Sequence, residues 1–410
     1  MTDERRWYAG VDWASESHHV CQTDNAGTKL GEKIFEHGGE GLADMAGWLI
    51  AMSGCVDPSQ IHIAIEVPHG PVVESLIERR FNVYGINPKQ MDRFRDRFTL
   101  AGAKDDSRDA KTMASALRTD TRCFRPLAAM DPIVIELREW SRIAEDLGAE
   151  RIRLTNRMRE QLWRYFPAML ELASDLAAPW LLDLWEVAPT PDKARRIRET
   201  TVARLLKQNR IRRLDAAQVL EVLRKEPVTV ADGTAAAARA HIATLIARIR
   251  LLNRQIDEAH HRLDRLTTEL ARSQESEPGQ VKQHDAEILA SLPGVGRIVL
   301  ATLLAEAWDA LQRRDYAALR SLTGVAPVTK RSGKSPIVIR RQACQERLSN
   351  AMYHWARVAV QHDRISRAKY AALRARGRSH GRALRSVADR LLNVACAMLK
   401  TGTTFNPSLT

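Results

Sequence analysis

Residues 7–14 read Trp-Tyr-Ala-Gly-Val-Asp-Trp-Ala, a short apolar run that contains one acid and then breaks. Apolar and aromatic residues bounded by polar sequence predict a buried strand. Asp12 is therefore expected inside or at the end of a central strand. A carboxylate taken out of water needs a partner, commonly a cationic side chain, a set of hydrogen-bond donors or a metal ion.

Two later stretches place acids in a matching setting. Glu66 follows the alternating apolar residues 61–65 and precedes a strand-breaking proline, so it repeats the placement of Asp12. Asp106 and Asp109 open a helical stretch and are three residues apart, so both carboxylates face the same way. Four such acids suit a pair of Mg²⁺ ions, with Mn²⁺ as a possible substitute, which would bridge a phosphate group.

Three of these acids also have simpler explanations. The helix dipole by itself favours acids such as Asp106 or Asp109 in a first turn, and Asp12 alone would fit a turn. Two strand-end acids together with an acid pair on one helix face are much harder to obtain by chance. The combination favours the metal site.

The order of expected elements in the first part of the chain predicts an α/β fold. Strands at 18–23 and 28–35 follow the first strand, and then come a helix at 41–52, the Glu66 strand, a helix at 72–80, a strand at 82–86 and the Asp106 helix. This is the order of the ribonuclease-H-like fold. We expect this domain to cover residues 1–125.

The charge of the chain is uneven. The chain has 410 residues and a net charge of +13, yet residues 310–402 alone hold twenty Lys or Arg against four Asp or Glu. A basic segment of this kind predicts a polyanionic partner, most simply nucleic acid. Five scattered cysteines and the lack of a membrane-spanning apolar run indicate a soluble, cytoplasmic protein without zinc or disulfides.

The middle of the chain, 126–275, is expected to be all-α. Apolar residues recur at helical spacing from Ile133 to Leu162, and more regularly from Ile242 to Leu270, which predicts a coiled coil. The two helices would pair within one chain and also join protomers, which predicts a homo-oligomer. Residues 167–233 form a helix-rich insert to which we assign no chemistry, and 273–283 is a plausible linker.

The basic C-terminal domain, 285–402, contains two candidate phosphate-binding segments. Gly294 and Gly296 lie between two helices, an arrangement like a helix-hairpin-helix element, although glycines before a helix also serve simple turns. Ser332 lies in a cationic loop where a hydroxyl either binds a phosphate or attacks it. The cationic residues expected to bind nucleic acid are Lys330, Arg331, Lys334, Arg340 and Arg341.

Taken together, these motifs resemble the DEDD transposases of bacterial insertion sequences, relatives of the pilin-gene invertases, whose N-terminal domain is similar to the Holliday-junction resolvase RuvC. The resemblance covers nearly the whole chain. It is carried by Gly-Val-Asp-Trp-Ala at 10–14, Ala-Ile-Glu at 64–66, Lys-Asp-Asp-Ser-Arg-Asp-Ala at 104–110, Leu-Pro-Gly-Val-Gly at 292–296, and Leu-Thr-Gly-Val-Ala-Pro at 322–327 with Arg-Ser-Gly-Lys at 331–334.

The resemblance implies a catalytic site in two parts. Asp12, Glu66, Asp106 and Asp109 would be the metal-binding tetrad, and Ser332 the nucleophile that forms a covalent link to DNA, assisted by carboxylates of a neighbouring protomer. Donor and target DNA would be selected by a structured guide RNA, the bridge RNA, and the coiled coil would build dimers or a tetramer. Asp105 and Ser335 are close alternatives to Asp106 and Ser332.

Two other functions remain open at this point. A RuvC-like junction resolvase would use the acids alone, with water as the nucleophile. A non-catalytic, basic architectural protein would use none of these residues for chemistry.

Overall fold

The computed structural model describes residues 6–98, 105–231, 233–273, 285–332 and 335–406. Contacts divide the chain into two compact units, Met1–Met130 and Asp131–Thr410, which are described separately. The second unit contains both the central helices and the C-terminal basic segment. The finer division at residues 125, 275 and 285 stays a prediction.

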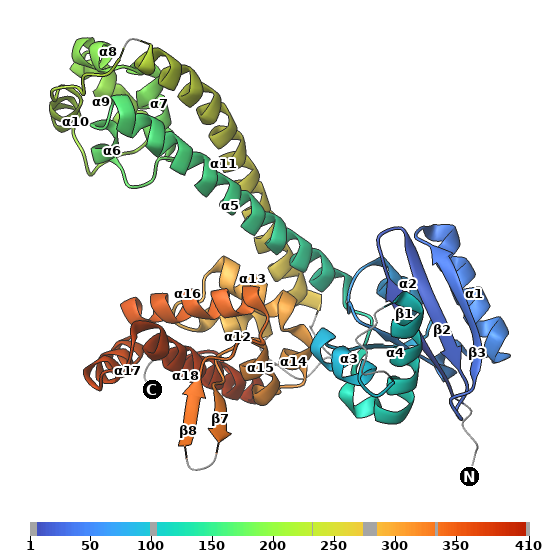
Figure 1. Cartoon of the computed structure of the whole chain (residues 1–410). Coiled ribbons are helices and arrows are strands. Elements are labelled where there is room, and N and C mark those ends of the chain that lie inside the picture. Colours follow the sequence, from blue (N-terminus) through green and yellow to red (C-terminus); the bar gives the residue numbers. More distant parts are fainter. Residues whose placement is uncertain (1–5, 99–104, 232, 274–284, 333–334, 407–410) are drawn as a thin grey trace. The chain divides into compact units, whose positions relative to one another are not determined.

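The first unit is built on a six-stranded sheet with the order β3-β2-β1-β4-β5-β6 (Figure 1). Strands β1, β4 and β5 are parallel, whereas β2, β3 and β6 run antiparallel to their neighbours. The strands span β1 Trp7–Trp13, β2 Ser17–Thr23, β3 Lys29–Glu36, β4 Ile61–Ile65, β5 Asn82–Gly85 and β6 Arg125–Leu127. The α/β sheet predicted from the sequence is confirmed, and β6 is an addition to it.

Helices cover both faces of this sheet. On one face, α1 (Gly39–Ser53) and α2 (Pro71–Glu78) pack Leu49 and Leu76 against Val11 and Ile63. On the other face, α3 (Pro88–Arg95) and α4 (Asp106–Asp120) pack Met91 and Met113 against Tyr8 and Ala64. Because successive strand residues point to opposite faces, the even-numbered positions of β1 lie under α4.

The second unit is organised by two long helices, α5 (Pro132–Tyr165) and α11 (Thr234–Ser273), which lie side by side in Figure 1. The apolar stripe predicted for α11 is buried from Ile242 to Leu270. α5 begins where Pro132 occupies the first turn and the Asp131 side chain accepts a hydrogen bond from the amide of Ile133.

The insert between these helices folds into a compact helical cluster. Its helices are α6 (Met169–Leu172), α7 (Pro179–Val187), α8 (Pro191–Arg196), α9 (Glu199–Gln208) and α10 (Ala216–Leu223). Trp180 and Trp185 are buried in one apolar core with Leu162 of α5 and Ile242 of α11. The insert is therefore helix-rich, as predicted.

Of the remaining helices, α13 (Arg297–Glu306) packs on the first turns of α5, and α12 (Asp285–Ser291) and α13 contact α11. Arg138 donates to the carbonyl of Ala305 at 3.1 Å, and Arg297 pairs with Asp264. The other elements are α14 (Trp308–Gln312), α15 (Tyr316–Leu322), β7 (Val328–Ser332), β8 (Ser335–Ile339), α16 (Glu346–His362), α17 (Arg364–Ala375) and α18 (His380–Thr401). No helix in the described part of the chain is both long and apolar enough to cross a membrane.

Candidate active site

Asp12 and Glu66 come together at one edge of the sheet. β1 and β4 are parallel neighbours in which Val11 lies opposite Ile65, so the next residues along the chain are Asp12 and Glu66. Both residues are partly buried. Because the strands are parallel, their carboxyl ends meet at the same edge, where open α/β sheets bind their ligands.

Gly10 allows α4 to approach this edge closely. A Cβ atom at Gly10 would lie 2.0 Å from the carbonyl oxygen of Ala110 and 2.8 Å from Cβ of Met113. Only glycine permits that approach of a helix to a strand. Asp12 lies two residues beyond Gly10 and shares its face of the sheet, so it is on the side covered by α4.

The first turn of α4 supplies the other two acids. The opposite end of the helix lies at the far edge of the sheet, where Arg118 donates to the carbonyl of Asn25 at 3.5 Å. The first turn therefore lies at the edge that carries Asp12 and Glu66. Asp106 is exposed there, whereas Asp109 is buried.

Asp105 has a separate task. Its side chain caps α4 by accepting a hydrogen bond from the amide of Arg108 at 2.9 Å. The same carboxylate forms an ion pair with the Arg108 side chain. A cap residue of this type stabilises the helix start by about 1 kcal/mol. These contacts account for Asp105 as a structural acid beside Asp106.

Asp109 has a cationic neighbour that the sequence did not reveal. Arg95 Nε lies 2.5 Å from Asp109 Oδ1, and the Asp109 side chain is only 2% exposed. The same guanidinium also contacts Asp92 in α3. Arg95 therefore supplies the charge compensation that a buried carboxylate requires.

A second cluster lies on β2 and β3 beside this edge. His19, which is opposite Asp12 in the sheet, contacts Glu32, and Glu32 also contacts Lys29. Hydrogen bonds from Lys29 and then Ser107 lower the pKa of Glu32 to about 2. Ser107 follows Asp106, so Glu32 ties β3 to the first turn of α4. Neither His19 nor Glu32 is among the site residues predicted from the sequence.

The donor set at this edge fits a hard divalent cation. Carboxylate oxygens are the ligands that Mg²⁺ prefers, and strand register and helix placement bring all four acids to one edge. Within the described residues, no three His, Cys, Asp or Glu side chains gather closely enough to hold a metal ion. The chemistry of the four acids and their common edge fit such an ion, but their side chains are not gathered around one point, and Asp109 is directed at Arg95.

The segment around Ser332 is a two-stranded hairpin rather than the loop that the sequence predicted. β7 and β8 are antiparallel, and Ser332 lies opposite Ser335 at the tip. All five residues of β8 are solvent-exposed, with Ile337 61% exposed, and residues 328–331 of β7 are exposed or half-buried, so no alternation of buried and exposed residues marked these strands. Lys330, Arg331 and Arg340 are exposed, Arg341 is half-buried, and Lys334 lies outside the described residues.

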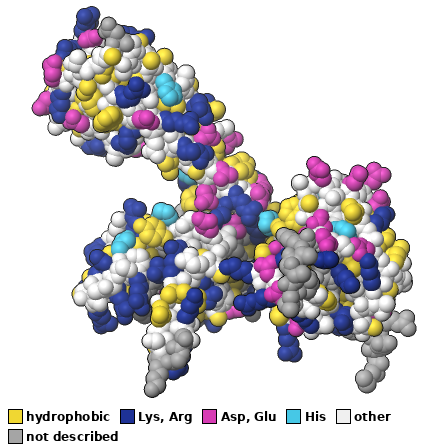
Figure 2. All heavy atoms as spheres, viewed as in Figure 1, with side chains coloured by type: hydrophobic (Ala, Val, Ile, Leu, Met, Phe, Trp, Pro, Cys, Tyr) yellow, Lys and Arg dark blue, Asp and Glu magenta, His cyan; other side chains and the backbone are white. Residues whose placement is uncertain are grey.

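The glycine turn at 292–296 joins α12 to α13, as predicted. Gly294 has φ +84°, and a Cβ atom there would lie 2.7 Å from the backbone nitrogen of Ala359 in α16. The indole of Trp355 donates to the carbonyl of Pro293 at 2.9 Å. Packing on α16 thus explains Gly294, whereas Gly296, at the start of α13, has open space around it. Figure 2 shows Lys and Arg gathered over the C-terminal helices.

Comparison with known proteins identifies the class. Residues 9–167 match a family model of DEDD transposases, and residues 286–371 match the model described as "Transposase IS116/IS110/IS902 family". The acid-bearing sheet and the C-terminal domain thus define a DNA transposase. The chain belongs to the IS116/IS110/IS902 family of transposases. DEDD transposases generally depend on divalent metal ions.

Three relatives illustrate the range of similarity. "Putative transposase y4uE" of Sinorhizobium fredii is 76% identical over 216 residues, which is 53% of this chain and 60% of that relative's length. "Mini-circle putative transposase for IS117" of Streptomyces coelicolor is 31% identical over 94% of this chain and 92% of its own length. An IS116 protein of Streptomyces clavuligerus is 28% identical over 99% of this chain and 98% of its own length.

Proposed function

We propose that this transposase cuts and rejoins DNA with a carboxylate site on the first unit and a serine on the β7–β8 hairpin. The observation that carries the first half is the register of β1 and β4, which brings Asp12 and Glu66 to one edge beneath the first turn of α4. The second half rests on Ser332 at the tip of an exposed, cationic hairpin, and on the family resemblance.

The proposed metal ligands are Asp12, Glu66, Asp106 and Asp109. They would hold Mg²⁺, as two ions, with Mn²⁺ as a substitute. A bound ion of this type stabilises negative charge that develops on a phosphodiester. In this proposal Asp109 exchanges Arg95 for the metal, so Arg95 balances the charge of the buried carboxylate until the metal binds.

Ser332 is proposed as the nucleophile. Its hydroxyl loses a proton as Oγ bonds to phosphorus, and the bond from phosphorus to one sugar oxygen breaks, so that the sugar leaves as a hydroxyl. Attack by the hydroxyl of another strand reverses the step and releases serine. The phosphodiester energy is kept in the serine link, so rejoining needs no further energy source.

The surrounding cations and glycines would hold nucleic acid. Arginine and lysine neutralise phosphates, and backbone amides at a helix start also bind them. The residues proposed for this role are Gly294, Gly296, Lys330, Arg331, Lys334, Arg340 and Arg341. Their DNA substrates are the donor and target duplexes.

Two partners complete the proposal. A structured guide RNA pairs with both DNAs, as the family resemblance implies, and the basic surface of the second unit offers it phosphate contacts. A coiled coil of α5 and α11 joins protomers into a dimer or tetramer. The carboxylates of one protomer then act with Ser332 of another.

The carboxylate half is tested by comparing Asp12→Asn with Asp105→Asn. Asparagine at 105 still caps α4, so this variant is a matched control. We expect Asp12→Asn to lower Mg²⁺-dependent cleavage by more than the roughly 10–100-fold that outer-shell partners cost, and Asp105→Asn to keep it. Equal cleavage by both variants would contradict a metal-binding role for Asp12.

A further inference from the structure

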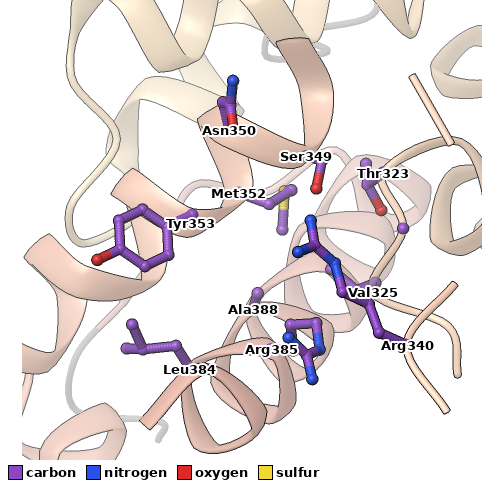
Figure 3. A pocket seen from close by; sticks show the side chains of 12 residues that line it. Thr323, Val325, Arg340, Ser349, Asn350, Met352, Tyr353, Leu384, Arg385 and Ala388 are labelled. Atoms are coloured by element: carbon purple, nitrogen blue, oxygen red, sulfur yellow. The ribbon is translucent and has the colours of Figure 1, made fainter. Parts of the chain in front are cut away.

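A hollow of about 270 Å³ lies between the segment after β8, the turn at 323–325 that follows α15, and helices α16 and α18 (Figure 3). Arg340 reaches into it from the hairpin side, Arg385 from α18, and Ser349 from α16. A second hollow of about 220 Å³ shares Arg340 and Arg385 with the first and adds Arg341 and Arg382. We call the two together the arginine pocket.

The arginine pocket concentrates positive charge without a matching acid. Burial, followed by the charges of Arg340 and Arg382, holds the pKa of Arg385 below its ordinary value. Asp389 lines the second hollow, but its carboxylate accepts hydrogen bonds from Nε and Nη2 of Arg320, at 2.7 and 2.8 Å. Among the described residues, no carboxylate pairs with Arg340, Arg382 or Arg385.

The chemistry of the lining specifies the missing anion. Guanidinium groups present a planar fork that matches two oxygens of a phosphate group. The hydroxyl of Ser349 and the amide of Asn350 add neutral donors. α18 begins at His380 beside the pocket, so the positive end of its dipole favours the same anion. A tetrahedral phosphate group suits all of these features.

The position of the pocket indicates which phosphate it takes. Arg340 directly follows β8, and the five residues of β8 separate it from the hairpin tip. At about 3.3 Å per residue that separation is about 17 Å. One strand of B-form DNA rises about 3.4 Å per nucleotide, so the distance corresponds to about five nucleotides.

We propose that the arginine pocket binds a backbone phosphate of the DNA strand that Ser332 attacks, about five nucleotides from the attacked phosphodiester. The pocket then fixes the register of that strand against the hairpin tip. This inference rests on the proposed function, because it takes Ser332 as the reacting end of the hairpin.

The test uses full-length Ser332→Ala protein with RNA from the element's flanks and without Mg²⁺, so binding is measured apart from cleavage. The DNA duplexes have the sequence that flanks the coding region of this protein. In each duplex a neutral methylphosphonate replaces one backbone phosphate, at a different position each time. We expect one position to weaken binding about tenfold or more, as for a lost charged hydrogen bond. Adding Arg340→Gln and Arg385→Gln should weaken binding of the unmodified duplex by the same factor. In this variant the methylphosphonate at that position should have no further effect on binding.

Three comparisons make the result specific. Arg357→Gln removes one charge from the exposed side of α16 and should keep the methylphosphonate sensitivity. Arg385→Lys keeps the charge without the fork and should bind more weakly. Removing mutually repelling arginines should not lower the melting temperature, which excludes misfolding as the cause.

The proposal is overturned if every methylphosphonate weakens the wild type and the pocket variants alike. It is also overturned if the methylphosphonate effect depends on Arg340 and Arg385 only with an RNA duplex of the same sequence. The methylphosphonate effect could depend on Arg340 and Arg385 in a protein that never forms a serine link to DNA. That result would support the phosphate site in the arginine pocket and contradict the proposed function, so the two failures are distinguishable.

Discussion

Gly10 shows how a single residue sets the geometry of the carboxylate edge. An added Cβ would meet the backbone carbonyl of Ala110, which cannot move unless α4 moves with it. Gly10→Ala should therefore destabilise the first unit by about 1–3 kcal/mol, measured by denaturant unfolding. Gly47→Ala is a matched control, because Gly47 lies within α1 with open space around it and should be neutral or slightly stabilising. Equal effects of the two changes would contradict the close approach of α4.

Glu32 makes stability depend on pH. Contacts with Lys29 and Ser107 lower its folded pKa from 4.5 to about 2, so the unfolded chain binds the proton more tightly. The stabilisation is complete above about pH 4.5 and is lost as the pH falls to about 2. Glu32→Gln should flatten the unfolding free energy in this window. Parallel curves for wild type and variant would show that the contacts with Lys29 and Ser107 contribute nothing.

At the residue scale the sequence predicted where the acids lie but not their partners. Strand-end placement and three-residue spacing are local patterns, so the positions of Asp12, Glu66, Asp106 and Asp109 in the fold were predicted, while their role as metal ligands stays a proposal. The contact of Arg95 with Asp109 joins residues from two helices. Nothing in the local sequence indicates that contact, because it depends on how α3 and α4 pack.

At the scale of elements, buried strands and long helices were predictable and exposed ones were not. β1 and β4 are apolar because both of their faces are covered, and the stripe on α11 packs continuously. β8 has no buried face, so its β-branched residues carried no periodic signal. α3 begins at Asn87-Pro88 and is mostly polar, and Met91 is its one buried residue, so apolar spacing did not reveal this helix.

The hairpin itself can be tested by breaking its ladder. Ile337 pairs with Lys330, and proline at 337 removes a strand donor. Since Ile337 is exposed, Ile337→Pro should change the unfolding free energy by less than about 1 kcal/mol. Misplacing Ser332 should lower its link to DNA by about a hundredfold, assayed on a denaturing gel. Ile337→Thr keeps strand propensity and should retain the serine link to DNA. If Ile337→Pro also retains the link, the hairpin is not needed to position Ser332.

At the scale of the whole molecule, the sequence predicted an acid-bearing α/β unit followed by helices, and the chain divides in that way. It could not predict the assembly. The apolar stripe of α11 already packs against α5 and the insert within one chain, so the same pattern is compatible with either partner. The way protomers combine to form an active site depends on surface residues that no sequence periodicity identifies.

The central claim is that Ser332 forms the covalent link. We would incubate wild-type, Ser332→Ala and Ser335→Ala proteins with Mg²⁺, RNA from the element's flanks, and donor and target duplexes, and then resolve protein–DNA adducts on a denaturing gel. The account predicts an adduct with wild type and Ser335→Ala and none with Ser332→Ala. An adduct that persists in Ser332→Ala, or Mg²⁺-dependent cleavage without any adduct, would contradict it, and the second result would favour a resolvase that uses the carboxylates alone.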